Sequence, residues 1–202
     1  MTQGPAGRRR VGLFGGTFDP PHVGHVAVAA DVADALDLGR VLWMPAGDPP
    51  HKSGPLTPAA TRLEMVRAAA ASDPRFEVST LEMDRPGPSY TVDTLRELRH
   101  AMPEADFYLI IGADQYASFA SWHEPAGIVE LSRLAVMDRA GDRAADLAPG
   151  IAVGDPVFVP VRRIDVSSTE VRARRRAGMH IEGLVPPGVR SIIEREGLYS
   201  GS

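Results

Sequence analysis

The stretch from Val11 to His25 constrains the fold of this chain more than any other part of the sequence. It starts as a short apolar run that suits a buried strand and passes through Gly15-Gly16 and a Pro-Pro turn. It ends in His22 and His25, where an alanine-rich helical pattern begins. Glycines let backbone N–H groups approach a ligand closely, and a helix N-terminus supplies further donors. We therefore predict a strand, a phosphate-binding loop and a helix, with both histidines able to donate to one phosphoryl group.

A plainer interpretation of the same stretch is a Gly-Gly turn followed by two surface histidines. A strand, two glycines and His-x-x-His at a helix start together form a much rarer pattern than a turn, and this favours the phosphate site. The stretch is neither a Walker A loop nor a G-x-G-x-x-G loop, since Gly12, Gly15 and Gly16 lack those spacings and no Gly-Lys-Ser/Thr follows.

Composition limits the class of protein. With 202 residues, 44% of them hydrophobic and 24% charged, the chain is predicted to form a disordered arm over 1–9 and a single globular domain over 10–202. The formal net charge of −4 argues against nucleic acid as a partner, and the sequence has no cysteine for disulfides or thiolate metal sites. It also has no apolar run of about 20 residues, so we expect no membrane span and a cytoplasmic location.

Apolar runs and helical patterns alternate along the rest of the chain. Strands are predicted at about 10–15, 41–45, 76–79, 107–111, 134–137 and 157–161, and helices at 26–38, 58–71, 91–101, 125–131 and from about 168. Thr57 is expected to be the N-cap of the second helix and Pro58 its first residue. This alternation predicts an α/β fold: a single doubly wound, Rossmann-like domain whose mostly parallel sheet binds ligands at the carboxyl ends of its strands.

A second motif lies late in the chain, at Ser167 to Arg172. Ser167 with Glu170 three residues later predicts a capping box, so a helix should begin near Ser168. Two interpretations compete for the same donors. The motif is either an ordinary capped helix with an exposed arginine, or a second helix N-terminus whose hydroxyls, N–H groups and Arg172 bind triphosphate oxygens.

Three further segments are candidates for an acceptor site, because each follows a predicted strand. Lys52, in a Pro-Pro-His-Lys loop, could reach a phosphate or be an exposed loop cation. Thr91 could cap the helix at 91–101 while neighbouring N–H groups meet an anion. Trp122 could pack in the core or offer a stacking face to a planar ring.

The two motifs, in this order, resemble those of the nucleotidyltransferase superfamily. Gly15 to His25 is similar to its first signature, and Val166 to Arg172 is similar to its late Ile/Val-Ser-Ser/Thr-Thr-x-x-Arg motif. With the other segments, the chain resembles the bacterial nicotinate mononucleotide adenylyltransferases from Val11 to Tyr199. The added segments are Pro-Pro-His-Lys at 49–52, Ser-Tyr-Thr at 89–91, Gly-Ala-Asp at 112–114, Trp122 and Arg-Ala-Gly at 139–141. The related pantetheine-phosphate adenylyltransferases are usually shorter, carry Thr in place of His22 and lack the Tyr-Thr and Trp pair.

The resemblance implies transfer of the adenylyl group of ATP to the 5′-phosphate of nicotinate mononucleotide, giving nicotinate adenine dinucleotide and pyrophosphate in NAD biosynthesis. It implies catalytic roles for His22, His25, Lys52 and Arg172. The implied ATP site comprises Gly15, Gly16, Thr17, Phe18, Asp114, Ser167, Ser168 and Thr169, and the implied mononucleotide site comprises Tyr90, Thr91, Trp122 and Arg139. Mg²⁺ should arrive with ATP, held mainly by phosphate oxygens and water, because no carboxylate cluster has ligand spacing.

Two other functions stay open: another phosphate-bearing acceptor within the superfamily, and a nucleotide-binding module without activity, against which intact His22, His25 and Arg172 argue. The chain departs from the family pattern at Ala140, where the family commonly has proline. It also has an acidic insertion from Asp142 to Asp155, to which we assign no role. The sequence does not indicate whether the chain forms homo-oligomers.

Overall fold

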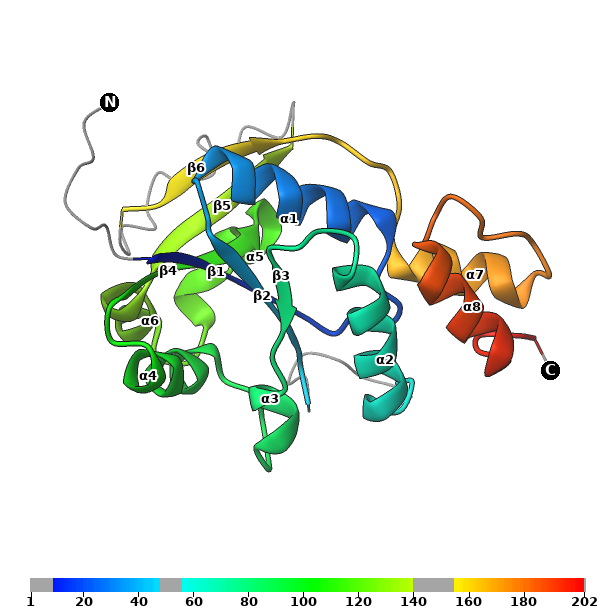
Figure 1. The fold of residues 1–202 in the computed structure, drawn as a ribbon, viewed down its shortest axis with the longest axis horizontal. Helices are drawn as coiled ribbons and strands as arrows, with labels where there is room; N and C mark the ends of the chain where they lie inside the picture. The colour runs from blue at the N-terminus through cyan, green and yellow to red at the C-terminus, as the bar shows by residue number, and fades with distance from the viewer. Residues whose placement is uncertain (1–8, 48–55, 140–154, 202) are drawn as a thin grey trace.

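The computed structural model describes residues 9–47, 56–139 and 155–201, and its strands form one sheet in the order β3-β2-β1-β4-β5-β6 (Figure 1). Every pair of neighbouring strands runs parallel. This is the strand order of a doubly wound α/β sheet, so the predicted fold class is confirmed, with a sheet that is parallel throughout rather than mostly. The strands are β1 (Arg9–Gly16), β2 (Arg40–Pro45), β3 (Phe76–Val78), β4 (Ala105–Gly112), β5 (Arg133–Arg139) and β6 (Val157–Val161).

Helices cover both faces of the sheet, as the strand crossovers require. In Figure 1 α1 and α2 lie on one side of the sheet, α4 and α6 lie on the other, and α7 and α8 extend beside α2 at the end of the molecule away from β4. The helices are α1 (Val23–Ala35), α2 (Ala59–Ala70), α3 (Leu81–Asp84), α4 (Thr91–Ala101), α5 (Ala113–Ala117), α6 (Pro125–Leu131), α7 (Ser168–Arg176) and α8 (Pro187–Arg195), with a 3₁₀ turn at Phe119–Ser121.

Two hydrophobic clusters form the core, one on each face of the sheet. Alternate residues of a strand point to opposite faces. Leu13 of β1 accordingly packs with α4 and α6 residues such as Leu95 and Ile128, whereas Phe14 packs with α1 and α2 residues such as Val32 and Met65. The near-continuous apolar run of β4 is buried on both faces, which is what a central parallel strand needs.

The termini of several elements differ from the sequence prediction. β1 begins at Arg9, which pairs with Ala105, and α1 begins at Val23 rather than at residue 26. Pro58 is the N-cap of α2, so the prediction that Thr57 would cap this helix is wrong. The Thr57 hydroxyl donates instead to the hydroxyl of Tyr199 (3.1 Å). The sequence prediction also missed α3, α5, the 3₁₀ turn and α8.

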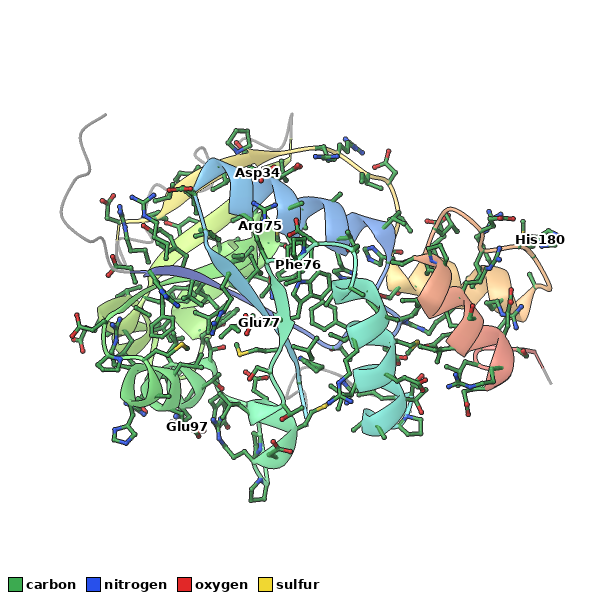
Figure 2. All side chains as sticks on the ribbon, in the orientation of Figure 1. Asp34, Arg75, Phe76, Glu77, Glu97 and His180 are labelled. Carbon is green, nitrogen blue, oxygen red and sulfur yellow. The ribbon has the colours of Figure 1, made fainter. Side chains whose placement is uncertain are left out.

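One ion pair connects α1 to the edge of the sheet at β3. Arg75, just before β3, reaches Asp34 of α1 with N···O 2.6 Å and also pairs with Asp73, and Figure 2 shows Asp34 and Arg75 close together above Phe76. Both carboxylates raise the pKa of the Arg75 guanidinium above its ordinary value, mainly through the hydrogen bonds to Asp73.

Among the described residues, no helix is long and apolar enough to cross a membrane. Of the arm predicted over 1–9, Arg9 belongs to β1 and residues 1–8 lie outside the described residues, as do the Lys52 loop and most of the acidic insertion.

Candidate active site

The strand order reverses between β1 and β4, and ligands of doubly wound sheets bind at the carboxyl ends of the strands where this happens. A pocket of ≈ 660 Å³ lies at this place. Gly15, Gly16 and Thr17 line it from the end of β1, and Ile111 lines it from β4. A side chain at Gly15 would meet no atom within 4 Å, so the glycine leaves the space in front of the strand open for a ligand.

The two signature histidines cap α1 through a reciprocal pair of hydrogen bonds. His22 is the N-cap, and its Nδ1 accepts from the N–H of His25 at 3.3 Å, while the N–H of His22 donates to Nδ1 of His25 at 3.1 Å. Their rings stack with centroids 3.6 Å apart. Because each Nδ1 accepts a backbone hydrogen, we assign the hydrogen of each neutral ring to Nε2. The pair thus has two Nε2–H donors of the kind that can bind a phosphoryl oxygen.

The helix N-terminus itself has fewer donors to offer than the sequence pattern predicts. The N–H of Val23 donates to the carbonyl of Leu184 at 3.0 Å, and that of His25 donates to the His22 ring. Two of the N–H groups in the first turn of α1 are therefore occupied by protein acceptors. These two N–H groups are therefore poor candidates for binding an anion, and the histidine side chains are the better ones.

The second motif packs directly on the loop that follows β1. The hydroxyl of Ser168 donates to the carbonyl of Pro20 at 2.8 Å, and Nη1 of Arg172 donates to the carbonyl of Asp19 at 2.7 Å. Nη2 of Arg172 also contacts the Thr169 hydroxyl at 3.2 Å. The two motifs, far apart in the sequence, therefore form one structural unit, as their resemblance to a single nucleotide site implies.

Ser167 and Gly24 show why these residue types stand in the motifs. Ser167 is the N-cap of α7, and its hydroxyl accepts from the N–H of Glu170 at 3.1 Å, which confirms this half of the predicted capping box. A Cβ on Gly24 would lie 3.0 Å from Nδ1 of His22 and 3.1 Å from Cγ1 of Val166. Only a hydrogen fits comfortably between the histidine ring and the second motif.

The loop between the glycines and the histidines is fixed by buried contacts. Phe18 adopts a left-handed conformation (φ 50°), which is strained for a bulky side chain, and its ring packs on those of His25 and Trp43 at centroid distances of 5.1 and 5.2 Å. Asp19 is 6% exposed, and its carboxylate accepts from the Tyr199 hydroxyl (2.5 Å) and the N–H of Thr57 (3.3 Å). The Phe18 side chain thus supports the His25 ring and does not line the pocket.

The other wall of the pocket carries the residues expected at the acceptor end. Tyr90, Thr91 and Trp122 all line it. Tyr90 stacks on His123 with ring centroids 4.2 Å apart, and Glu124 pairs with Arg96 of α4, so the loop before α6 is bound to α4. Thr91 is the first residue of α4, whose N-cap is Tyr90, so the prediction that Thr91 caps this helix is wrong.

Glu82 is a buried carboxyl group in the same pocket that no sequence pattern singles out. It is 7% exposed and accepts a hydrogen bond from the Thr94 hydroxyl at 3.1 Å. Burial raises the pKa of Glu82 above its ordinary value, and the Thr94 bond and the charge of Arg85 oppose that shift. Its carboxyl therefore takes up a proton more readily than an exposed glutamate does.

Arg62 of α2 is a second residue that sequence reasoning missed. It is 2% exposed. Its guanidinium binds backbone carbonyls in and near the signature loop, which we define as residues 15–25, and the Thr17 carbonyl is one of them. The signal was present, because Arg62 has the helical spacing of the buried residues Met65, Val66 and Ala69 and so falls on the apolar face of α2. A charged residue at such a position needs internal partners.

The structure brings together most of the residues that the sequence selected. Those that line the pocket are Gly15, Gly16, Thr17, Tyr90, Thr91 and Trp122. The other residues of the two motifs do not line this pocket: Phe18, His22 and His25 belong to the signature loop, Ser168 and Arg172 pack on it, and Ser167 and Thr169 lie at the start of α7. Asp114 stands apart in α5, with its carboxylate against Gly112 at the end of β4. Lys52 lies outside the described residues, and of Arg139 only the backbone, at the end of β5, is described.

Comparison with known proteins identifies the family of this chain. Residues 13–174 match the cytidylyltransferase-like family. The chain is 46% identical over 190 residues to a probable nicotinate-nucleotide adenylyltransferase of Thermus thermophilus, with 94% of this chain and 99% of that protein covered. It is 42% identical over 191 residues to the corresponding protein of Geobacillus thermodenitrificans, with 94% and 86% covered.

A solved structure shares the fold at lower sequence similarity. The nicotinic acid mononucleotide adenylyltransferase of Plasmodium falciparum, in complex with NaAD, superposes with a TM-score of 0.77 at 18% identity and covers 95% of this chain and 97% of its own. The family match spans most of the chain, and the curated relatives align with nearly all of it. The chain therefore belongs to the nicotinate-nucleotide adenylyltransferase family of nucleotidyltransferase enzymes.

Proposed function

We propose that this enzyme transfers the adenylyl group of ATP to the 5′-phosphate of nicotinate mononucleotide, giving nicotinate adenine dinucleotide and pyrophosphate in NAD biosynthesis. The observation that supports this most strongly is that one pocket is lined both by Gly15 to Thr17 of the signature loop and by Tyr90, Thr91 and Trp122. A dinucleotide product needs such a continuous site, because its two halves are joined at the reacting phosphates.

The reaction requires no protein nucleophile. A phosphate oxygen of the mononucleotide attacks the α-phosphorus of ATP. The new P–O bond forms as the bond to the bridging oxygen of pyrophosphate breaks, and pyrophosphate leaves with that electron pair. The attacking phosphate is already ionised at neutral pH, so the protein contributes in-line positioning and stabilisation of charge at the α-phosphate.

His22 and His25 supply that stabilisation through their Nε2–H groups. Their backbone-bonded Nδ1 atoms fix the orientation of both rings before substrate arrives, and such preorganised donors are worth more than donors that must reorient. Arg172, together with Ser167, Ser168 and Thr169 at the start of α7, binds triphosphate oxygens, and Lys52 adds a further cation. Gly15, Gly16, Thr17, the backbone of Phe18 and Asp114 complete the ATP site.

The acceptor binds at the wall formed by α4 and the loop before α6. Trp122 provides a stacking face for the pyridine ring, and Tyr90 and Thr91 lie at the positive end of the α4 dipole, which favours a carboxylate over a neutral amide. Arg139, from the end of β5, assists in binding the mononucleotide. A preference for the acid mononucleotide over its amide follows from this arrangement.

Mg²⁺ is the metal ion that we expect with ATP, and when bound it neutralises charge on the phosphate oxygens. The residues of the described ranges include no group of three His, Cys, Asp or Glu side chains placed to bind a metal ion. We expect phosphate oxygens and water to provide most of its ligands, as is usual for Mg²⁺ bound to a nucleotide. The cytoplasmic location stays a prediction.

A pyrophosphate-release assay with ATP and each of three acceptors tests the proposal. We expect rapid release with nicotinate mononucleotide and slower release with nicotinamide mononucleotide. With phosphopantetheine we expect only background. Rapid release with phosphopantetheine and none with nicotinate mononucleotide would assign the enzyme another acceptor, and ATP binding without turnover on any acceptor would reject enzymatic transfer.

A further inference from the structure

We propose that Arg62 is a positioning residue for adenylyl transfer, which fixes the loop after β1 against the end of β2 and so sets two walls of the pocket. The inference rests on the proposed function, because it concerns the same site. Arg62 itself lies outside the pocket lining. It acts through the backbone of Thr17 and Ala46, both of which line the pocket.

The guanidinium group of Arg62 donates to four backbone carbonyls from three separate segments. Nη1 donates to Thr17 (3.0 Å) and to Ala46 (2.8 Å), Nη2 donates to Gly47 (3.2 Å), and Nε donates to Thr57 (3.1 Å). Thr17 follows β1, Ala46 and Gly47 follow β2, and Thr57 precedes α2. One rigid, planar group therefore joins three segments just beyond the last β1–β2 hydrogen bond, in which the N–H of Ala46 donates to the carbonyl of Gly16 at 2.9 Å.

One further contact extends this arrangement to the acceptor side. A Cβ on Gly47 would overlap the carbonyl oxygen of Glu82, so the chain after β2 lies directly against α3. Glu82 in turn lines the pocket. A shift of the Gly47 carbonyl would therefore be passed to both the ATP side and the acceptor side of the site.

The chemistry of the site requires an arginine. The side chain is 2% exposed, and burial lowers the pKa of the guanidinium from its ordinary value, although the nearby Asp19 carboxylate opposes this shift. A guanidinium stays charged and presents five N–H donors in a fixed plane, whereas the ammonium of lysine is a compact point charge with three donors. Lysine can keep the charge but cannot bridge three segments with the same geometry.

The test compares Arg62→Lys and Arg62→Ala with Arg67→Lys, whose side chain is exposed on the same helix. For each protein we would measure the thermal midpoint, kcat and KM in pyrophosphate release, and the Kd of a non-hydrolysable ATP analogue. The assays would be run well below the midpoint and normalised to folded protein. We expect Arg62→Lys to remain folded and its kcat to fall about 10- to 100-fold, because small misplacements of reacting groups lower the rate steeply. The Kd of the ATP analogue should rise several-fold. Arg67→Lys should match the wild type.

A rescue experiment separates positioning from simple destabilisation. Guanidinium chloride at non-denaturing, millimolar concentration should raise kcat of Arg62→Ala several-fold while leaving the wild type and Arg67→Lys unchanged. The proposal would be overturned if folded Arg62→Lys and Arg67→Lys had the same kcat and the same Kd for the analogue. It would also be overturned if all variants responded to guanidinium in the same way. If the wild type itself released no pyrophosphate with nicotinate mononucleotide, the proposed function would fail, and the analogue Kd would still decide whether Arg62 shapes the nucleotide site.

Discussion

At the scale of single residues, the chemistry depends on which ring nitrogen of each histidine carries its hydrogen. The sequence pattern could place His22 and His25 together at a helix start, but it could not decide which nitrogen of a neutral ring carries the hydrogen. The reciprocal bonds to Nδ1 decide it, since a hydrogen on either Nδ1 would face a backbone N–H. Both rings are therefore oriented by the same few atoms that start α1.

Replacement of His22 tests the electrostatic role of this pair. We expect His22→Ala to lower kcat by about 10²–10³-fold, as loss of one preorganised donor does elsewhere, with a small change in KM for ATP. Steady-state pyrophosphate release measures both constants. His180→Ala removes an exposed histidine at the far end of the molecule (Figure 2) and should leave them unchanged. Near-normal turnover of His22→Ala would remove this residue from the mechanism.

Gly24 offers a finer test, because it changes the ring position without removing the ring. The added methyl group of Gly24→Ala would press on His22 at 3.0 Å and on Val166 at 3.1 Å. We expect kcat to fall by about tenfold or more, since displacements well below 1 Å already reduce catalysis, while the thermal midpoint changes little. Gly39→Ala is the matched control, because its nearest neighbour would be 4.0 Å away. Equal kcat for the two variants would show that the His22 ring tolerates displacement.

Other residues of the site could not be selected from the sequence alone. Glu82 is an ordinary charged residue until the fold buries it. The position of Arg62 on the apolar face of α2 indicated its burial, but not which distant carbonyls it would bind. His123 gains its place only because it stacks on Tyr90, more than thirty positions earlier in the sequence. Single-sequence reasoning finds groups with a local motif, and it misses groups whose role arises from contacts between distant segments.

At the scale of elements, local signals decided which helices were predicted. The long strands are apolar runs, α4 has a clear helical period, and α6 begins with proline in its first turn, so their ranges match closely. α3 and α5 have four and five residues and are too short to show a helical period. The prediction for α8 failed for another reason: Pro187 starts it and Val189, Ile192 and Ile193 form its buried face, so the signal existed and was overlooked.

The pairing of α3 with α4 through Glu82 leads to a prediction about pH. Burial raises the pKa of Glu82 in the folded state above its ordinary value of 4.5, so the folded protein binds more protons than the unfolded chain between those two pKa values. The contribution of Glu82 to stability is thus greatest at low pH and is lost as pH rises through its folded pKa. We expect Glu82→Gln, which can still accept from Thr94, to melt about 2–4 °C above the wild type at pH 8.

This advantage should shrink as pH falls toward 4.5, because the wild-type carboxyl is then protonated. Thermal melts of both proteins across this pH range measure the difference. Glu130→Gln alters a more accessible carboxyl on α6 and should show no such dependence. A constant difference between Glu82→Gln and the wild type at all pH values would contradict the raised pKa.

At the scale of the whole molecule, the sheet positions the site and the C-terminal segment secures it. The alternation of strands and helices was enough to predict a doubly wound sheet with its ligand at the carboxyl edge, because right-handed crossovers leave few other topologies. It could not predict that the chain after α8 returns to the signature loop. Tyr199 has a positive φ of 59° and reaches Asp19, a contact between residues 180 positions apart.

This long-range contact should be among the most stabilising side-chain hydrogen bonds that anchor the signature loop. Tyr199→Phe removes the hydrogen bond from the Tyr199 hydroxyl to the buried Asp19 carboxylate. The longer bond from the N–H of Thr57 to Asp19 stays. We expect the free energy of unfolding to fall by about 1.5–3 kcal/mol. Urea denaturation at pH 7.5 measures the loss, and Ser200→Ala, the exposed neighbour, should show none.

Burial and the Asp19 carboxylate raise the pKa of Tyr199 above its ordinary 10.0, so this stabilisation is complete below pH 10 and is lost as pH rises through the higher pKa of the folded protein. The difference between the wild type and Tyr199→Phe should therefore narrow well above pH 10, and a difference that stayed constant there would show that the Tyr199 hydroxyl does not stabilise the loop.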